Sequence, residues 1–168
     1  MVTETTRLEF RQFAAEDAPG FFELNNDPEV IRFTGDVAFN DEGEALEFLL
    51  GYRHYALHGY GRWSLYLKST GEYVGFCGLK HSPDNSEVDL GFRLLRRYWY
   101  QGLATEAATE ALRMGFESYR LDRIVGRAME DNHASHRVLE KLGMVRAGQF
   151  VESGRIWCRY EIVSRRLP

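Results

Sequence analysis

The stretch from Arg97 to Glu106 constrains the fold more than any other part of this sequence. It reads Arg-Tyr-Trp-Tyr-Gln-Gly-Leu-Ala-Thr-Glu, between a segment of alternating apolar residues and an alanine-rich segment with helical periodicity. The pattern predicts a strand, a loop ending at Gly102, and a helix whose first amides, about Gln101 to Thr105, lack acceptors within the helix. Such a helix start binds anions, of which phosphate is the commonest in biology, so we expect a phosphate-bearing cofactor here.

Periodicity along the rest of the chain predicts a mixture of strands and helices. The predicted strands cover residues 6–13, 62–68, 72–80, 87–93, 123–129, 144–152 and 155–163, and the predicted helices begin at Glu16 and Pro28 and cover 41–58, 102–119 and 134–142. Ser69-Thr70-Gly71 reads as a hairpin turn, so we expect three successive antiparallel strands between residues 62 and 93. No internal repeat or Pro/Ser-rich linker divides the chain, which favours a single domain over residues 1–168.

Composition narrows the classes of function. A length of 168 residues with 44% apolar content is typical of one globular domain, and the formal charge of −4 argues against nucleic acid as a principal partner. The N-terminus lacks the apolar core of a signal peptide, and no apolar run approaches the ~18 residues of a membrane helix. We therefore expect a soluble, cytoplasmic protein that does not associate with membranes.

The metal-ligating residue types do not form a convincing site. Cys77 and Cys158 each lie in a strand-like segment without Cys-x-x-Cys spacing, which favours two small core residues over a disulfide or zinc site. His54 and His58 are four residues apart on a predicted helix, but no third ligand stands out, so we interpret them as surface histidines and predict no metal.

The strand before the loop carries two carboxylates. Alternation places Val88, Leu90 and Phe92 on one face, and Glu87 and Asp89 on the other, about 6.6 Å apart along the strand. Each carboxylate disfavours ionisation of the other, which raises a pKa toward the range of a general base. The alternative is a solvated strand face with two ordinary acids.

A second motif follows the predicted strand over 123–129. It runs from Asn132 to Gly143 as Asn-His-Ala-Ser-His-Arg-Val-Leu-Glu-Lys-Leu-Gly, and Asn132 is a natural helix N-cap. Together with the Gln-Gly-Leu-Ala-Thr-Glu-Ala loop, it resembles the GCN5-related N-acetyltransferase (GNAT) superfamily. The segment Thr6 to Phe13, then Glu16-Asp17 and Asn26-Asp27-Pro28-Glu29-Val30, resembles the RimJ/RimL branch of ribosomal-protein N-terminal acetyltransferases.

The resemblance implies an α/β (α+β) fold, with a mostly antiparallel, twisted sheet of about seven strands and helices on both faces. It implies acetyl-CoA as the donor, with the pyrophosphate on the backbone amides of the loop and the pantetheine arm paired with the main chain of the preceding strand. Arg96 or Arg97 would meet a phosphate, or would be solvated, and Asn132 would contact the cofactor near its thiol. The implied cofactor-binding residues are Phe92, Arg93, Leu94, Arg97, Gln101, Gly102, Leu103, Ala104, Thr105, Asn132 and Ser135.

The implied reaction is direct attack of a primary amine on the thioester within a ternary complex. Asp89 stands where the branch often has a glutamate, so we assign it as the base, acting through a water, with Glu87 in reserve. Leu139 occupies the place of the tyrosine acid of many members, and the branch suggests Ser135 as its substitute; a cap or cofactor contact is an equal alternative for Ser135. Tyr100 stands where the branch commonly has a glycine, which puts the shape of the loop in doubt.

The acceptor is the open part of this hypothesis. The branch implies a protein N-terminal α-amine, a small-molecule amine is the alternative, and a non-catalytic acyl-CoA-binding sensor is a third possibility. A cluster of aromatic residues is interpreted mainly as core, with polar tips that line an acceptor groove as the alternative: Tyr52, Tyr55, Tyr60, Trp63 and Tyr66. The sequence leaves the choice between monomer and homodimer open.

Overall fold

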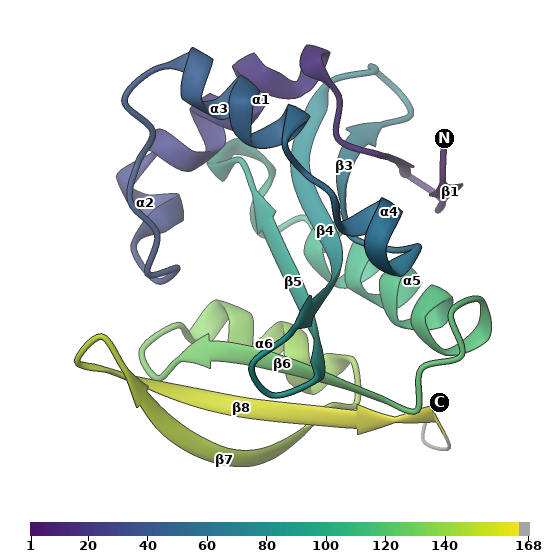
Figure 1. Ribbon diagram of the computed structural model, residues 1–168, viewed down its shortest axis with the longest axis vertical. Helices are drawn as coiled ribbons and strands as arrows, with labels where there is room; N and C mark the ends of the chain where they lie inside the picture. Colours follow the sequence, from purple (N-terminus) through teal and green to yellow (C-terminus); the bar gives the residue numbers. More distant parts are fainter. Residues whose placement is uncertain (165–168) are drawn as a thin grey trace.

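The computed structural model describes residues 1–164 and contains one eight-stranded sheet with helices on both faces (Figure 1). The strands are β1 (Thr3–Glu4), β2 (Leu8–Arg11), β3 (Arg62–Leu67), β4 (Tyr73–Ser82), β5 (Glu87–Leu94), β6 (Arg123–Met129), β7 (Val145–Glu152) and β8 (Arg155–Val163). They lie in the order β1-β2-β3-β4-β5-β6-β8-β7, and all neighbours are antiparallel except β5 and β6. The predicted fold is therefore confirmed, with β1 as an additional strand.

Two groups of helices cover the two faces of the sheet. One face carries α1 (Ala18–Asn26), α2 (Pro28–Ile31), α3 (Glu42–Leu50) and α4 (His54–His58), and the other carries α5 (Leu103–Glu117) and α6 (His133–Lys141) (Figure 1). Short 3-10 turns, η1 (Ala15–Asp17) and η2 (Arg96–Tyr98), precede α1 and the loop before α5. The expected continuous helix over residues 41–58 is wrong, because α3 ends at Leu50, with Gly51 as its C-cap, and α4 starts at His54.

Small residues allow α5 and α6 to lie close to the sheet. A side chain at Gly115 of α5 would clash with Ile124, and one at Gly126 of β6 would clash with Leu139 of α6. Leu103, Ala107, Ala111 and Leu112 of α5 are buried, as its apolar stripe predicts. The start of α5 is thereby held near the sheet, on the side where β5 ends.

Cys77 and Cys158 are both buried, unpaired thiols in the core. Burial raises the pKa of the Cys77 thiol to about 12. Both are therefore structural residues, as the sequence predicts. In residues 1–164, no helix is long and apolar enough to cross a membrane.

Candidate active site

The sheet opens in the middle, between β5 and β6. These parallel strands pair only at Asp89 with Val125 and at Leu90 with Gly126, whereas β5 pairs with β4 from Glu87 to Leu94. Beyond Leu90, no strand within residues 1–164 pairs with the β6-facing edge of β5. Main-chain groups on an unpaired strand edge are free to bind an extended ligand.

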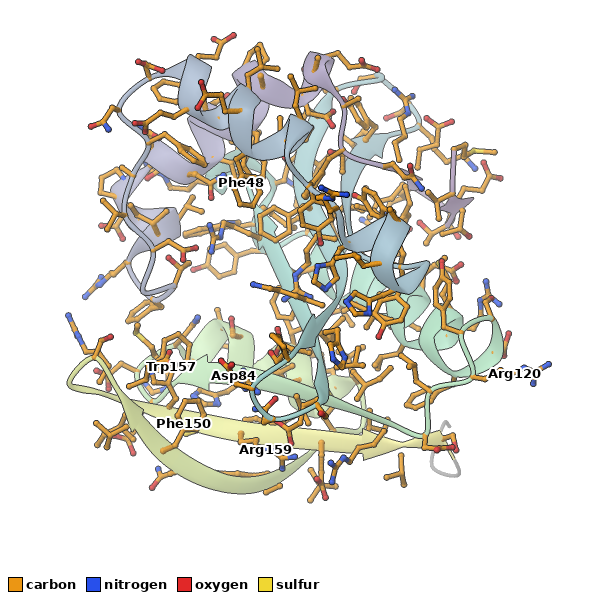
Figure 2. The ribbon with its side chains drawn as sticks, in the orientation of Figure 1. Phe48, Asp84, Arg120, Phe150, Trp157 and Arg159 are labelled. Carbon is orange, nitrogen blue, oxygen red and sulfur yellow. The ribbon has the colours of Figure 1, made fainter. Side chains whose placement is uncertain are left out.

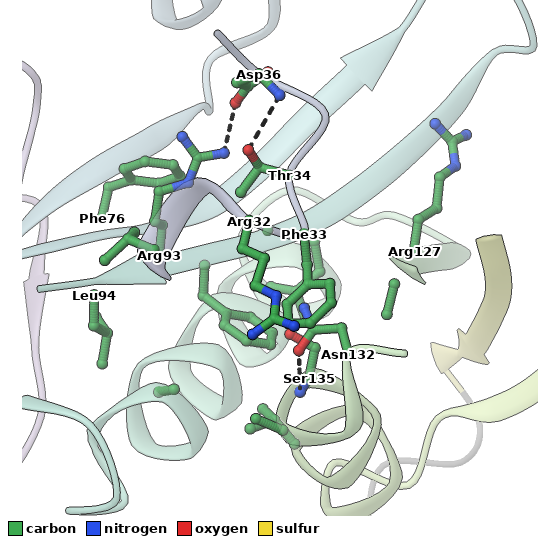
Figure 3. A pocket seen from close by; sticks show the side chains of 18 of the residues that line it. Arg32, Phe33, Thr34, Asp36, Phe76, Arg93, Leu94, Arg127, Asn132 and Ser135 are labelled. Carbon is green, nitrogen blue, oxygen red and sulfur yellow. Dashed lines mark hydrogen bonds and ion pairs between the residues drawn. The ribbon is translucent and has the colours of Figure 1, made fainter. Parts of the chain in front are cut away.

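A cavity of about 1150 Å³ occupies this opening. Its lining includes Gly91 to Leu94 of β5, Gly102 to Thr105 at the start of α5, and Asn132 and Ser135 at the start of α6. Figure 3 shows lining side chains that come from the segment after α2, from β4, β5 and β6, and from the start of α6. The sequence-predicted residues that line it are Asp89, Phe92, Arg93, Leu94, Gly102, Leu103, Ala104, Thr105, Asn132 and Ser135.

The start of α5 has the features of an anion site. Gly102 adopts a φ of +77° at the N-cap, and the first helical hydrogen bond runs from the amide of Glu106 to the carbonyl of Gly102. The amides of Leu103 to Thr105 therefore have no acceptor within the helix. Tyr100 has a φ of +59°, so this non-glycine residue adopts the left-handed conformation in the loop.

Arg7, in the N-terminal segment, holds the loop before α5 through hydrogen bonds. Its guanidinium donates to the carbonyl of Gln101 at 2.8 Å and to the carboxylate of Glu106 at 2.6 Å. Gln101 itself donates to the carbonyl of Arg97 and is absent from the cavity lining. Arg97 is also absent from the lining, because its guanidinium binds Glu23 at 2.5 Å, and Arg96 binds Asp27 at 3.0 Å.

Asp89 lies in the cavity wall beside the opening, held by an arginine that the sequence analysis missed. Nη2 of Arg62 donates to Oδ2 of Asp89 at 2.6 Å, and Nη1 donates to the carbonyl of Asp89 at 2.7 Å. A side chain at Gly91 would clash with the Arg62 guanidinium. Gly91, two residues after Asp89, therefore makes room for the arginine, and Oδ1 of Asp89 is left for a water or an amine.

Glu87 has different neighbours. Its carboxylate forms ion pairs with Arg127 at 3.0 Å and Arg159 at 2.5 Å, and it is absent from the cavity lining. The hydrogen bond from Arg159 lowers the pKa of Glu87 despite its partial burial. The expectation of a raised pKa is wrong for this residue, because arginines from β6 and β8 outweigh the repulsion between neighbouring carboxylates.

The start of α6 presents Asn132 and Ser135 to the cavity. Oδ1 of Asn132 accepts the amide N–H of Ser135 at 3.2 Å, as an N-cap does (Figure 3). Because this bond uses Oδ1, the side-chain NH₂ of Asn132 remains available as a donor, and the Ser135 hydroxyl lies one turn into the helix. Leu139 is buried under the sheet against Gly126, so the helix offers no tyrosine acid at that place.

Aromatic side chains form the remaining side of the cavity. Of the tyrosines and the tryptophan proposed from sequence, Tyr52 lines it, whereas Tyr60, Trp63 and Tyr66 are buried in the core. Phenylalanines from separate segments join Tyr52, and sequence analysis missed them because each reads as an ordinary apolar position. Trp157 and Phe150, from the β7–β8 hairpin, line the cavity as well (Figure 2).

Histidines and acidic residues do not create a metal centre in the described part of the chain. No group of three or more His, Cys, Asp or Glu side chains within residues 1–164 has an arrangement that would hold a metal ion. His54 and His58 contact each other on α4, and Nε2 of His54 accepts the amide N–H of His81 at 2.9 Å.

Comparisons with known proteins place this arrangement in a family. Residues 7–145 match the family described as "Acetyltransferase (GNAT) domain". An uncharacterized N-acetyltransferase of Bacillus licheniformis, p20, is 30% identical over 146 residues, which cover 86% of this chain and 82% of the relative.

Solved structures agree with this match. A GNAT-family acetyltransferase from Bacillus anthracis has a TM-score of 0.86 at 24% identity, covering 97% of this chain and 98% of the other. A spermidine N-acetyltransferase from Vibrio cholerae, in complex with CoA and spermine, has a TM-score of 0.83 at 16% identity, covering 96% and 98%. The chain belongs to the GNAT acetyltransferase family, and it is an acetyl-CoA-dependent N-acyltransferase.

Proposed function

We propose that acetyl-CoA crosses the sheet through the opening between β5 and β6. Its pyrophosphate binds the amides of Leu103 to Thr105, and its pantetheine arm pairs with the main chain of Phe92 to Leu94. The free helix start, the unpaired strand edge and the cavity that joins them support this placement. Gly102 leaves the approach to the amides open, because no side chain projects from it.

The thioester end then lies near Asn132 and Ser135. The amine nitrogen attacks the thioester carbonyl carbon, and the C–S bond breaks. The Ser135 hydroxyl donates to the departing sulfur and relays a proton to it from a solvent water, so that the serine ends the step protonated. A water held on Oδ1 of Asp89 takes the proton released by the amine and passes its own proton to the Asp89 carboxylate. Both Asp89 and Ser135 line the same cavity, which supports this division of roles.

The acceptor that fits best is the α-amine of a polypeptide, as in the RimJ/RimL branch that the sequence resembles. Direct attack on the thioester requires an acceptor that can lose its proton near neutral pH. An α-amine, with a reference pKa of about 7.7 to 8.0, meets that condition better than an alkylamine near 10.4.

A small-molecule amine is the second candidate, favoured by the similarity in fold to the spermidine acetyltransferase. The charge of the cavity argues against a polyamine, because its lining contains seven basic and five acidic side chains. A polycation would meet net repulsion there, whereas the phosphates of acetyl-CoA would be attracted.

Two measurements test the proposed function. Isothermal titration calorimetry with acetyl-CoA reports binding of the donor, and release of free thiol reports turnover with N-terminal peptides and with small amines. We expect binding, together with faster turnover on peptides than on polyamines. Binding without turnover on any acceptor would indicate a non-catalytic sensor, and the absence of binding would exclude both functions.

A further inference from the structure

Six aromatic rings form one side of the cavity, and we call them the aromatic wall. They come from the segment after β2, from α1, from the loop before α3, from α3 and the segment that follows it, and from β4. The members are Phe13, Phe21, Phe39, Phe48, Tyr52 and Phe76.

The rings of the aromatic wall are packed against one another before any ligand arrives. Phe21 stacks on Phe48 with ring centroids 5.4 Å apart, and Phe13 contacts Tyr52 at 4.8 Å and Phe76 at 6.2 Å. Phe48 nevertheless remains 48% exposed, on the side of α3 that faces the cavity (Figure 2). Binding of an apolar group over a preformed apolar surface in a concave site is favourable, because it removes apolar area from water.

The wall begins beside the proposed base. The hydroxyl of Tyr52 accepts the amide N–H of Arg62 at 2.8 Å, and Arg62 holds Asp89. On the sheet, Phe76 pairs in register with Arg93, which lies on the same face of β5 as Asp89, about 13 Å further along the strand. An acceptor whose amine lies at Asp89 can therefore contact the aromatic wall with a group that is several bonds from that amine.

The charged side chains between Asp89 and the aromatic wall form ion pairs. Arg93 binds Asp36 at 2.6 Å and lies over the Phe76 ring, as Figure 3 shows, and Arg62 binds Asp89 at 2.6 Å. Both carboxylates of these pairs already have a cationic partner. This part of the cavity therefore offers little attraction to a second ammonium group of an acceptor, and the rings remain its main surface for recognition.

We propose that the acceptor carries an aromatic or bulky apolar group several bonds from its amine, and that the aromatic wall binds this group. The proposal rests on the proposed acetyl transfer and names the chemistry of its acceptor. That chemistry has two sources: a free arylalkylamine, or a polypeptide with an aromatic side chain within its first two residues.

The test compares acceptors that differ only in the ring. The free-amine arm uses 4-phenylbutylamine against butylamine, and the peptide arm uses Ala-Phe-Ala-Ala against Ala-Ala-Ala-Ala, with thiol release measured at saturating acetyl-CoA. We expect kcat/KM to be at least about tenfold higher with the ring, the scale of one aromatic contact. The arm with the larger kcat/KM identifies the source.

Phe48→Ala provides the matched variant, with Leu50→Ala as its control. Both residues are exposed apolar positions on α3, but Leu50 is absent from the cavity lining. Phe48→Ala should lower kcat/KM about tenfold for the ring-bearing acceptors alone, mainly through KM. Leu50→Ala should leave the preference intact, and Phe48→Leu should restore part of it.

The outcomes separate the two proposals. Turnover that is equal with and without the ring, or a Phe48→Ala loss that is equal for both acceptors, overturns the aromatic preference and leaves acetyl transfer standing. Turnover on no amine, although acetyl-CoA binds, overturns the proposed transfer and the acceptor chemistry that depends on it.

Discussion

Asp89 and Glu87 are two residues apart on β5, yet their surroundings differ. Asp89 lines the cavity with one arginine partner, whereas Glu87 lies outside it between arginines of β6 and β8. Spacing along a strand cannot reveal such a difference, because the partners come from β3, β6 and β8. Only the register of the sheet brings them together.

Substitution of each carboxylate should therefore have a different effect. We expect Asp89→Asn to lower kcat by about 10²-fold with an unchanged Kd for acetyl-CoA, because the amide cannot accept the proton. Glu87→Gln should keep kcat close to that of the unmodified protein and should lower the free energy of unfolding by about 1–3 kcal/mol, through loss of its charged hydrogen bonds. Steady-state kinetics, calorimetry and urea unfolding measure these quantities.

An Asp89→Asn variant with full activity across the pH range would exclude Asp89 as the base. A large loss of kcat in a well-folded Glu87→Gln variant would return that role to Glu87.

Gly102 is tested by comparison with Gly71. The two glycines have nearly the same φ, +77° and +72°, but Gly102 lines the cavity and Gly71 lies in the turn between β3 and β4. Replacing either by leucine strains the backbone by about 1–3 kcal/mol. Only Gly102→Leu should also weaken acetyl-CoA binding, by about tenfold or more, because the side chain obstructs the phosphate site.

Calorimetry of both variants provides the readout. Equal acetyl-CoA dissociation constants for Gly102→Leu and Gly71→Leu would contradict the placement of the pyrophosphate.

At the scale of elements, sequence patterns predicted features that depend on neighbouring residues and missed contacts between residues that are far apart in the sequence. The starts of α2, α5 and α6, the β3–β4 hairpin and the Asn132 cap depend on a few neighbouring residues, and they were predicted to within one residue. Arg62 could not be assigned to Asp89, because β4 lies between β3 and β5 and its register decides the contact. The aromatic wall escaped for the same reason, since its members come from separate segments.

The helix α4 predicts a pH dependence of stability. Burial, the largest cause, lowers the pKa of His54, and neighbouring His58, Lys80 and Arg62 add to the effect. The folded state thus favours neutral His54, whose Nε2 accepts the His81 amide. Stability from this source is fully present above the unfolded pKa of about 6.5 and declines as the pH falls below it, levelling off below the lower folded value.

Urea unfolding between pH 7.5 and 5.0 measures this effect. His54→Gln keeps a neutral acceptor in place of Nε2 and should flatten the pH dependence, whereas His133→Gln, at an exposed position on α6, should leave it unchanged. The same slope in both variants would assign the effect to other groups.

At the scale of the whole molecule, the parallel ladder of β5 and β6 is short. Two paired positions join the β1–β5 part of the sheet to the part formed by β6, β8 and β7, with α5 packed across β4, β5 and β6. A ligand that binds both sides of the opening should therefore stabilise the whole fold. The sheet order alone cannot be derived from strand patterns, because parallel pairing depends on the path of α5.

Acetyl-CoA at a hundredfold excess over its Kd should stabilise the protein by about 2.7 kcal/mol, which corresponds to a rise in Tm of about 5–10 °C for a chain of this size. Differential scanning fluorimetry measures the rise, and hydrogen exchange locates it. Exchange should slow at residues 91–94 and 103–105 and stay unchanged at the β7–β8 turn. Slowing confined to β7 and β8 would place the donor elsewhere.

The residues proposed to bind the acceptor and those proposed to bind the donor also lie in different parts of the sequence. All six rings of the aromatic wall precede Asp89, and every residue assigned to acetyl-CoA follows it, from Phe92 to Ser135. Substitutions confined to the aromatic wall can therefore alter which amine is chosen without altering how the donor is held. Diversification of such an enzyme needs changes in one contiguous stretch of coding sequence, and a chimaera joined within β5 would inherit its two specificities from different parents.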